Sequence, residues 1–251
     1  MEAVLGFLIA FAIAITGVGA GTITAPVLML FLGVEPAIAV GTALVFSVIV
    51  KIPAGISYYA KKKVHIPTVL LMAAGGVPGV IVGTFMLGHL AQNKELKTII
   101  LIIVGVIVLL SAIMNITLML RRVDLSSHHE KLKPLIPLFT FFIGLEVGFS
   151  SAGAGALGTL LLLYTTNLFA CTVIGTDIIF GLVLSAVGGG IHLGMGSVDH
   201  MLTLKLAAGG IFGSLAGVHF ASMIPTRPLR FALLGWLIFI GSQLLYRGIS
   251  G

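Results

Sequence analysis

Two glycine-rich interruptions in apolar sequence are the strongest candidates for chemistry in this chain. The first is Gly17-Val18-Gly19-Ala20-Gly21 and the second is Ser150-Ser151-Ala152-Gly153-Ala154-Gly155. A helix that begins in mid-membrane exposes unpaired N–H groups and a positive partial charge, so it can bind an anion without any charged side chain. We expect the two breaks to approach each other and to form one central anion site.

The candidate substrate-binding residues are small or hydroxyl-bearing residues at the breaks and in two later Gly-Thr pairs, together with one lysine. They are Gly19, Gly21, Thr22, Gly41, Thr42, Lys51, Ser150, Ser151, Gly153, Gly155, Gly175 and Thr176. The alternative role for glycine is close helix packing, because small residues also line helix interfaces in membranes. We expect that packing role for Gly75, Gly76, Gly79 and Gly83 and for their copies.

Three charged residues lie inside apolar segments: Lys51, Glu146 and Asp177. Charges at such positions are costly and by default indicate function. In the functional interpretation, Lys51 attracts an anion, and Asp177 or Glu146 carries a coupling proton. In the alternative interpretation, Lys51 forms a structural ion pair with one of the two carboxylates.

The other reactive side chains give no sign of metal or cofactor chemistry, and we expect neither. A single cysteine, Cys171, excludes an intramolecular disulfide and a cysteine-rich metal site. His192 and His219 lie near the ends of apolar segments, where we expect structurally satisfied histidines. A membrane enzyme is disfavoured because no nucleophile–base set is recognisable.

The composition indicates a protein whose solvent is lipid. Of the 251 residues, 58% are hydrophobic and 9% are charged, whereas soluble domains carry roughly 25% charged residues. The net charge of +6 arises from bases clustered between apolar segments, as the positive-inside rule places them, and does not indicate nucleic-acid binding. We expect a multi-pass protein of the cell inner membrane whose partners are the bilayer and a small anion. A homo-oligomer remains open.

The chain repeats itself at an interval of 134 residues. Gly19, Gly41, Gly75, Gly79 and Gly83 recur as Gly153, Gly175, Gly209, Gly213 and Gly217. A duplicated hydrophobic unit with interrupted helices in matching places is typical of secondary transporters. We divide the chain into a first transmembrane repeat (1–120), a polar cytoplasmic linker (121–133) and a second repeat (134–251).

Eight apolar stretches predict an all-α polytopic membrane protein with four segments in each repeat. They cover 3–32, 36–60, 66–90, 96–120, 134–164, 168–193, 201–224 and 229–246. Six of them fit one crossing each, since a helix needs about 20 apolar residues to span the hydrocarbon core. The first stretch of each repeat is longer and contains the glycine break.

The long broken stretches allow two topologies. They are either single tilted crossings, which give parallel repeats, or re-entrant hairpins, which give inverted repeats. Both topologies place the Lys61–Lys63 loop and the linker on the cytoplasmic side. We favour inverted repeats, because they recur in transporters with interrupted helices. The hairpin topology places both termini opposite the Lys61–Lys63 loop.

Three motifs resemble one known family over nearly the whole chain. They are the Gly17–Gly21 break followed by Pro26, the Ala39-Val40-Gly41-Thr42 segment, and Gly75-Gly76-Val77-Pro78-Gly79-x-x-x-Gly83. They are similar to the TauE/SafE family of sulfite exporters. The resemblance implies an integral membrane carrier that moves sulfite, thiosulfate, organosulfonates or related small anions, usually outward.

The residues and the resemblance together predict a secondary transporter for small sulfur-containing anions, with export coupled to protons. An uncoupled anion channel of the same architecture is the alternative. Concentrative transport that collapses with a protonophore distinguishes the carrier from the channel.

Overall fold

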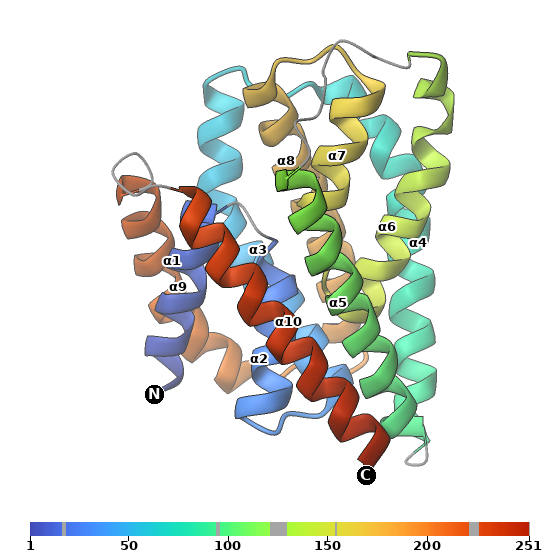
Figure 1. The fold of residues 1–251 in the computed structure, drawn as a ribbon, viewed down its shortest axis with the longest axis vertical. Coiled ribbons are helices and arrows are strands. Elements are labelled where there is room, and N and C mark those ends of the chain that lie inside the picture. Colours follow the sequence, from blue (N-terminus) through green and yellow to red (C-terminus); the bar gives the residue numbers. More distant parts are fainter. Residues whose placement is uncertain (17–18, 94–95, 121–129, 154, 221–225, 251) are drawn as a thin grey trace.

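The computed structural model describes residues 1–250 except 17–18, 94–95, 121–129, 154 and 221–225 (Figure 1). All regular elements of the described residues are helical. In chain order they are α1 (Glu2–Thr16), α2 (Ala20–Phe31), α3 (Pro36–Ala60), α4 (Ile66–Gln92), α5 (Lys97–Leu120), η2 (Glu130–Leu135), α6 (Ile136–Ser150), α7 (Ala156–Thr165), α8 (Ala170–Gly194), α9 (His200–Phe220) and α10 (Thr226–Ser250).

Six helical segments are long and apolar enough to cross a membrane, which fits the predicted polytopic membrane protein. They are Pro36–Ala60, Ile66–Gln92, Thr98–Thr117, Leu132–Ser150, Ala170–Gly194 and Phe231–Ile249. Five of them coincide with stretches expected to cross once. The sixth, Leu132–Ser150, is the first arm of the broken stretch of the second repeat. Helix α9 is not among the six, although its sequence predicted a crossing.

Both helix interruptions lie where the glycine-rich sequence predicted them. Helix α1 ends at Thr16 and α2 begins at Ala20, while α6 ends at Ser150 and α7 begins at Ala156. Gly17, Val18 and Ala154 lie outside the described residues. In Figure 1, α1 rises from the N-terminus and α2 returns downward, whereas α6 descends and α7 returns upward.

The helices pack in reciprocal pairs drawn from the two halves of the chain. Helix α4 packs along α6 and α1 packs along α9, while α3 contacts α8 and α5 contacts α10. Both termini lie at the lower end of the molecule in Figure 1, and the α3–α4 loop lies at the upper end. The first arm of each broken segment therefore packs mainly on the third segment of the other half.

The glycines of α4 and α9 allow this close packing. A Cβ atom on Gly75, Gly79 or Gly83 would overlap a backbone carbonyl of α6. The copies Gly209 and Gly213 stand in the same relation to α1. The predicted packing role of these glycines is confirmed, since only a residue without a side chain lets the backbones approach so closely.

Candidate functional site

The two helix breaks are in direct contact in the protein interior. The Ser151 hydroxyl donates a hydrogen bond of 2.9 Å to the carbonyl oxygen of Gly21. A Cβ atom on Gly21 would overlap the backbone carbonyl of Ser151. Both residues are buried, so each break forms part of the surroundings of the other.

The second break is a tight turn built from left-handed backbone conformations. Ser151, Gly153 and Gly155 have φ values of 60°, 92° and 120°. The Ser150 hydroxyl donates to the carbonyl of Glu146 at 2.9 Å and accepts from the amide of Ala152 at 3.2 Å. Ser150 thereby shapes the turn, whereas Gly153 and Gly155 supply conformations that side chains disfavour.

Glu146 lies over this turn. Its Oε1 accepts a 2.6 Å hydrogen bond from the Ser111 hydroxyl of α5. Its Oε2 lies 2.9 Å from the position that a Cβ atom on Gly153 would take. The carboxylate of α6 is therefore beside the second break, as its position in the sequence indicated.

Asp177 contacts the helix that leaves the second break. Its Oδ2 accepts a 2.8 Å hydrogen bond from the Thr159 hydroxyl in the first turns of α7. Its Oδ1 lies against Gly158 and has no hydrogen-bond partner. Only 3% of the Asp177 surface is exposed, so half of this carboxyl group is both buried and unpartnered.

Lys51 reaches across from α3 to α8. Its Nζ donates to the carbonyl of Gly181 at 3.4 Å and to the hydroxyl of Ser185 at 3.3 Å. The ammonium also experiences the field of Asp177. No ion pair within 4.0 Å joins Lys51 to Asp177 or Glu146, all three of which are described. The direct ion pair of the alternative interpretation is therefore absent.

The first break contributes backbone and one hydroxyl residue. Gly19 precedes the first turn of α2 and its carbonyl accepts the amide of Thr22 at 3.1 Å. Thr22 and Gly21 are both buried. Of these residues, Gly21 contacts Ser151 of the second break.

The two Gly-Thr pairs lie elsewhere and hold loops in place. The Thr42 hydroxyl accepts the amide of Asp199 at 3.1 Å, so it anchors the α8–α9 loop. The Thr176 hydroxyl accepts the amide of His65 at 3.0 Å, so it anchors the α3–α4 loop. A Cβ atom on Gly41 would meet the backbone of Ser197, and one on Gly175 would meet that of Lys63. Thr42, Gly175 and Thr176 thus contact these loops, whereas Gly41 contacts both the α8–α9 loop and the His192 side chain.

Several buried or hydrogen-bonded polar residues of the interior were missing from the sequence-based candidates. They are Ser47, Thr84, Ser111, Thr159 and Ser185. Ser47 could have been predicted from the sequence, because it lies one helical turn before Lys51 and shares its face. The hydrogen-bond partners of Glu146 and Asp177 could not be predicted from the sequence, because they belong to other helices.

His192 contradicts the expectation of a structurally satisfied histidine. Its side chain is fully buried, and neither ring nitrogen has a hydrogen-bond partner. The ring packs against α3 at Gly41. A buried polar group usually finds a partner, because leaving it without one costs about 1–3 kcal/mol.

The polar groups surround the second break and not the first. At the repeat interval of 134 residues, the positions that match Glu146, Thr159, Asp177 and Thr84 are Ala12, Ala25, Ala43 and Val218. The first break thus presents backbone where the second presents ionisable and hydroxyl side chains. The two halves of the site are chemically unequal.

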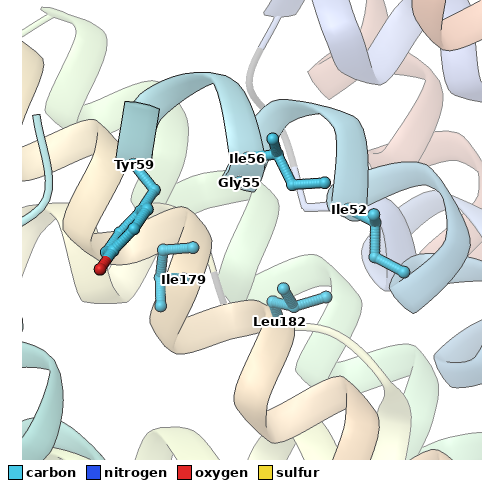
Figure 2. A pocket seen from close by; sticks show the side chains of 6 residues that line it. All are labelled: Ile52, Gly55, Ile56, Tyr59, Ile179 and Leu182. Atoms are coloured by element: carbon cyan, nitrogen blue, oxygen red, sulfur yellow. The ribbon is translucent and has the colours of Figure 1, made fainter. Parts of the chain in front are cut away.

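Figure 2 shows an apolar groove between α3 and α8, which is a poor fit for a small anion. It is lined by Ile52, Gly55, Ile56, Tyr59, Ile179 and Leu182. These side chains offer almost no hydrogen-bond donors, whereas anion sites need them. The contact between the two breaks is therefore the better candidate site.

Comparisons with known proteins agree with a transport role. A family model described as "Sulfite exporter TauE/SafE" matches residues 3–244. The chain is 30% identical over 249 residues to the probable membrane transporter protein YjnA of Bacillus subtilis (strain 168), a match that covers 96% of this chain and 97% of the relative. It is 24% identical over 265 residues to the probable membrane transporter protein YunE of the same organism, with 98% and 97% covered.

No solved structure gives a significant match to this chain. The assignment therefore rests on the family model and the relatives, and on helices that are long and apolar enough to span a membrane. Together these findings establish that the chain belongs to the TauE/SafE sulfite exporter family of membrane transporters.

Proposed function

We propose that this protein is a secondary carrier that exports a small sulfur-containing anion, such as sulfite, thiosulfate or an organosulfonate, with the transport coupled to protons. The observation that carries the proposal is the buried contact between Ser151 and Gly21. Interrupted helices that meet inside a membrane protein leave backbone groups for a substrate, and such backbone is tolerated only where it is buried or lines a cavity.

The proposed architecture is a pair of inverted repeats, 1–120 and 134–251, joined by the cytoplasmic linker 121–133. Residues 121–129 of the linker lie outside the described residues. Support comes from the opposite directions of the two arms in each broken segment (Figure 1) and from the reciprocal pairing of α1 with α9 and of α6 with α4. In this arrangement α1–α2 and α6–α7 are re-entrant hairpins that enter from opposite faces of the inner membrane.

In the proposed mechanism, the anion binds where the hairpin tips meet. The N-terminus of α2 supplies a positive partial charge there, and the glycine backbone leaves room for the substrate. Lys51 adds a full positive charge from the α3–α8 interface, where its ammonium is held only by neutral oxygens. An anion therefore meets no competing ion pair at Lys51.

Proton coupling is assigned to the carboxyl groups at the second break. Asp177 is the first candidate, because its Oδ1 is buried without a partner and its charge interacts with Lys51. Glu146 is the second candidate, and Ser111 already donates to its Oε1. Protonation of Asp177 would remove a negative charge from the surroundings of Lys51 and so strengthen anion binding, which links occupancy by the anion to occupancy by the proton.

The test of the proposed function is transport by purified protein in liposomes. Sulfite, thiosulfate, taurine and sulfoacetate are offered in turn, with and without an imposed pH gradient. We expect concentrative movement of at least one anion that collapses when a protonophore is added. Anion conductance that ignores the pH gradient would instead establish the channel alternative, and transport of none of the four would contradict the proposal.

The inverted topology predicts that the termini and the Lys61–Lys63 loop lie on opposite sides of the membrane. Single cysteines are introduced by Lys61→Cys and Ser250→Cys in a Cys171→Ala background. Lys61 is preferred to Lys62, whose φ of 55° makes it a strained site for substitution. With a membrane-impermeant maleimide on intact cells and on inverted vesicles, we expect the Lys61 site to label only from the cytoplasm and the Ser250 site only from outside. Labelling of both sites from one side would refute the inverted repeats.

Removal of the buried carboxyl group should separate transport from coupling. In Asp177→Asn, we expect anion counterflow between equal internal and external pools to persist, because exchange needs no net proton movement. We expect accumulation driven by the pH gradient to be lost. Glu146→Gln is the matched control and should keep gradient-driven accumulation. The opposite result would move the coupling role to Glu146, and coupling retained in both variants would contradict a carboxyl carrier.

A further inference from the structure

Four residues of the described part of the chain carry buried side-chain atoms without hydrogen-bond partners. They are Ser47, Thr84, Asp177 and His192. Ser47 shares a helical face with Lys51, and Asp177 is hydrogen-bonded to Thr159 of α7, so both belong with groups already described. Thr84 and His192 have no part in the mechanism proposed above. Both side chains are completely buried. Three of their polar atoms have no hydrogen-bond partner: the Thr84 hydroxyl and the two ring nitrogens of His192.

Thr84 and His192 converge on the end of α6. A Cβ atom on Gly148 would lie 3.0 Å from the Thr84 hydroxyl, and one on Gly188 would lie 3.5 Å from it. Gly188 is one helical turn before His192 on α8, so the two residues share a face. The His192 ring lies beside the backbone of Gly148, with which it interacts only weakly. Gly148 itself is two residues before the second break.

Glycines surround these two side chains on three helices. Gly41 of α3 and Gly148 of α6 border the His192 ring, while Gly148 and Gly188 border the Thr84 hydroxyl. A Cβ atom on Gly41 or Gly148 would overlap a backbone carbonyl of a neighbouring segment, and one on Gly188 would press against Val80 and Leu44. Packing alone explains the glycines, but it does not explain why two hydrogen-bonding side chains are buried there without partners.

We propose that Thr84 and His192 are substrate-binding residues that donate hydrogen bonds to oxygen atoms of the transported anion. A hydroxyl and an imidazole N–H are two donors suited to the oxygens of a sulfite or sulfonate group. The two donors border the last turn of α6, so they add side-chain recognition to the backbone of the second break. This inference rests on the proposed function, since it identifies how the same site recognises its anion.

The experiment compares stability and binding in variants that remove each donor while keeping its shape. They are Thr84→Val and His192→Phe, and the control is Thr140→Val. Thr140 is an equally buried threonine on α6 whose hydroxyl is satisfied by the carbonyls of Ile136 and Pro137. Sulfite is the first probe, followed by thiosulfate and taurine. Melting temperature without ligand and Kd by calorimetry are measured on purified protein.

We expect the affinity of Thr84→Val and of His192→Phe for the anion to fall by about tenfold each, as the loss of one hydrogen bond to a charged group predicts. Their melting temperatures without ligand should stay equal or rise, because an unsatisfied buried group has been replaced by an apolar one. Thr84→Ser and His192→Gln, which keep a donor, should recover part of the affinity. Thr140→Val should bind as the wild type does.

Unchanged affinity in both donor-removing variants would overturn the inference and would indicate that water satisfies these atoms. A lower melting temperature with unchanged affinity would assign both residues a structural role. Should His192→Phe fail to fold, the nearly isosteric Thr84→Val decides the question. Failure of the proposed function is seen separately, as a wild-type protein that binds none of the anions offered.

Discussion

Gly21→Val should abolish anion binding, with the largest effect of any single substitution at the breaks. The new Cβ atom would collide with the backbone carbonyl of Ser151, which cannot move aside as the end of a flexible side chain can. The breaks must therefore separate, and the hydrogen bond from Ser151 to Gly21 is lost with them. We expect anion affinity to fall by at least about a hundredfold, since displacing the backbone donors of an anion site forfeits several hydrogen bonds at once.

Two further variants distinguish loss of the site from loss of the fold. Gly190→Val makes the same substitution in a helix where nothing lies within 4 Å of the new Cβ atom, so it should bind normally. Ser151→Ala removes the hydrogen bond to Gly21 without adding bulk and should weaken binding modestly, consistent with about 1 kcal/mol for one hydrogen bond. The measurements are Kd by calorimetry and the melting temperature. Normal binding by a folded Gly21→Val protein would restrict Gly21 to a packing role.

Lys51→Met should leave the protein folded and greatly reduce its affinity for the anion. The ammonium of Lys51 is held by Gly181 and Ser185, both neutral groups, and methionine fills a similar volume. A positive charge in a low-dielectric interior contributes strongly to anion binding. We expect the Kd to rise by about tenfold or more, which corresponds to about 1.4 kcal/mol.

The stability of Lys51→Met tests the remaining structural alternative. If the field between Lys51 and Asp177 chiefly holds the fold, the variant loses thermal stability, because breaking a buried charge pair costs about 3–5 kcal/mol. The double variant Lys51→Met/Asp177→Asn would then recover that stability. Under the transport role, the double variant stays as stable as the wild type and still binds the anion weakly. Unchanged affinity in a folded Lys51→Met protein would leave the helix N-termini as the source of positive potential.

The sequence predicted the features that depend on local pattern. The helix ends at Ala60 and Leu120 and the interruptions before Ala20 and Ala156 lie where composition and glycine placed them. The packing role of the Gly75 segment followed from its four-residue spacing, because that spacing puts small residues on one face of a helix. The membrane class followed from hydropathy alone, since lipid tolerates apolar surface that water does not.

The sequence was a poorer guide wherever two distant segments supply one contact. Thr42 and Thr176 occupy matching positions of the repeat and were both predicted to bind substrate, yet each anchors a loop of the opposite half. His192 looked like an ordinary histidine near a segment end, and its lack of partners is visible only once α4, α6 and α8 are packed together.

The sequence by itself therefore determined that this chain is a helical membrane protein with two glycine breaks and three charges within its apolar segments. Only the tertiary structure decided which of those groups meet. It joined Ser151 to Gly21 and Lys51 to Ser185, and it gathered the polar side chains at the second break. The physical reason is that hydropathy and glycine spacing act on neighbours along the chain, whereas these contacts join residues up to 134 positions apart and depend on how whole helices pack.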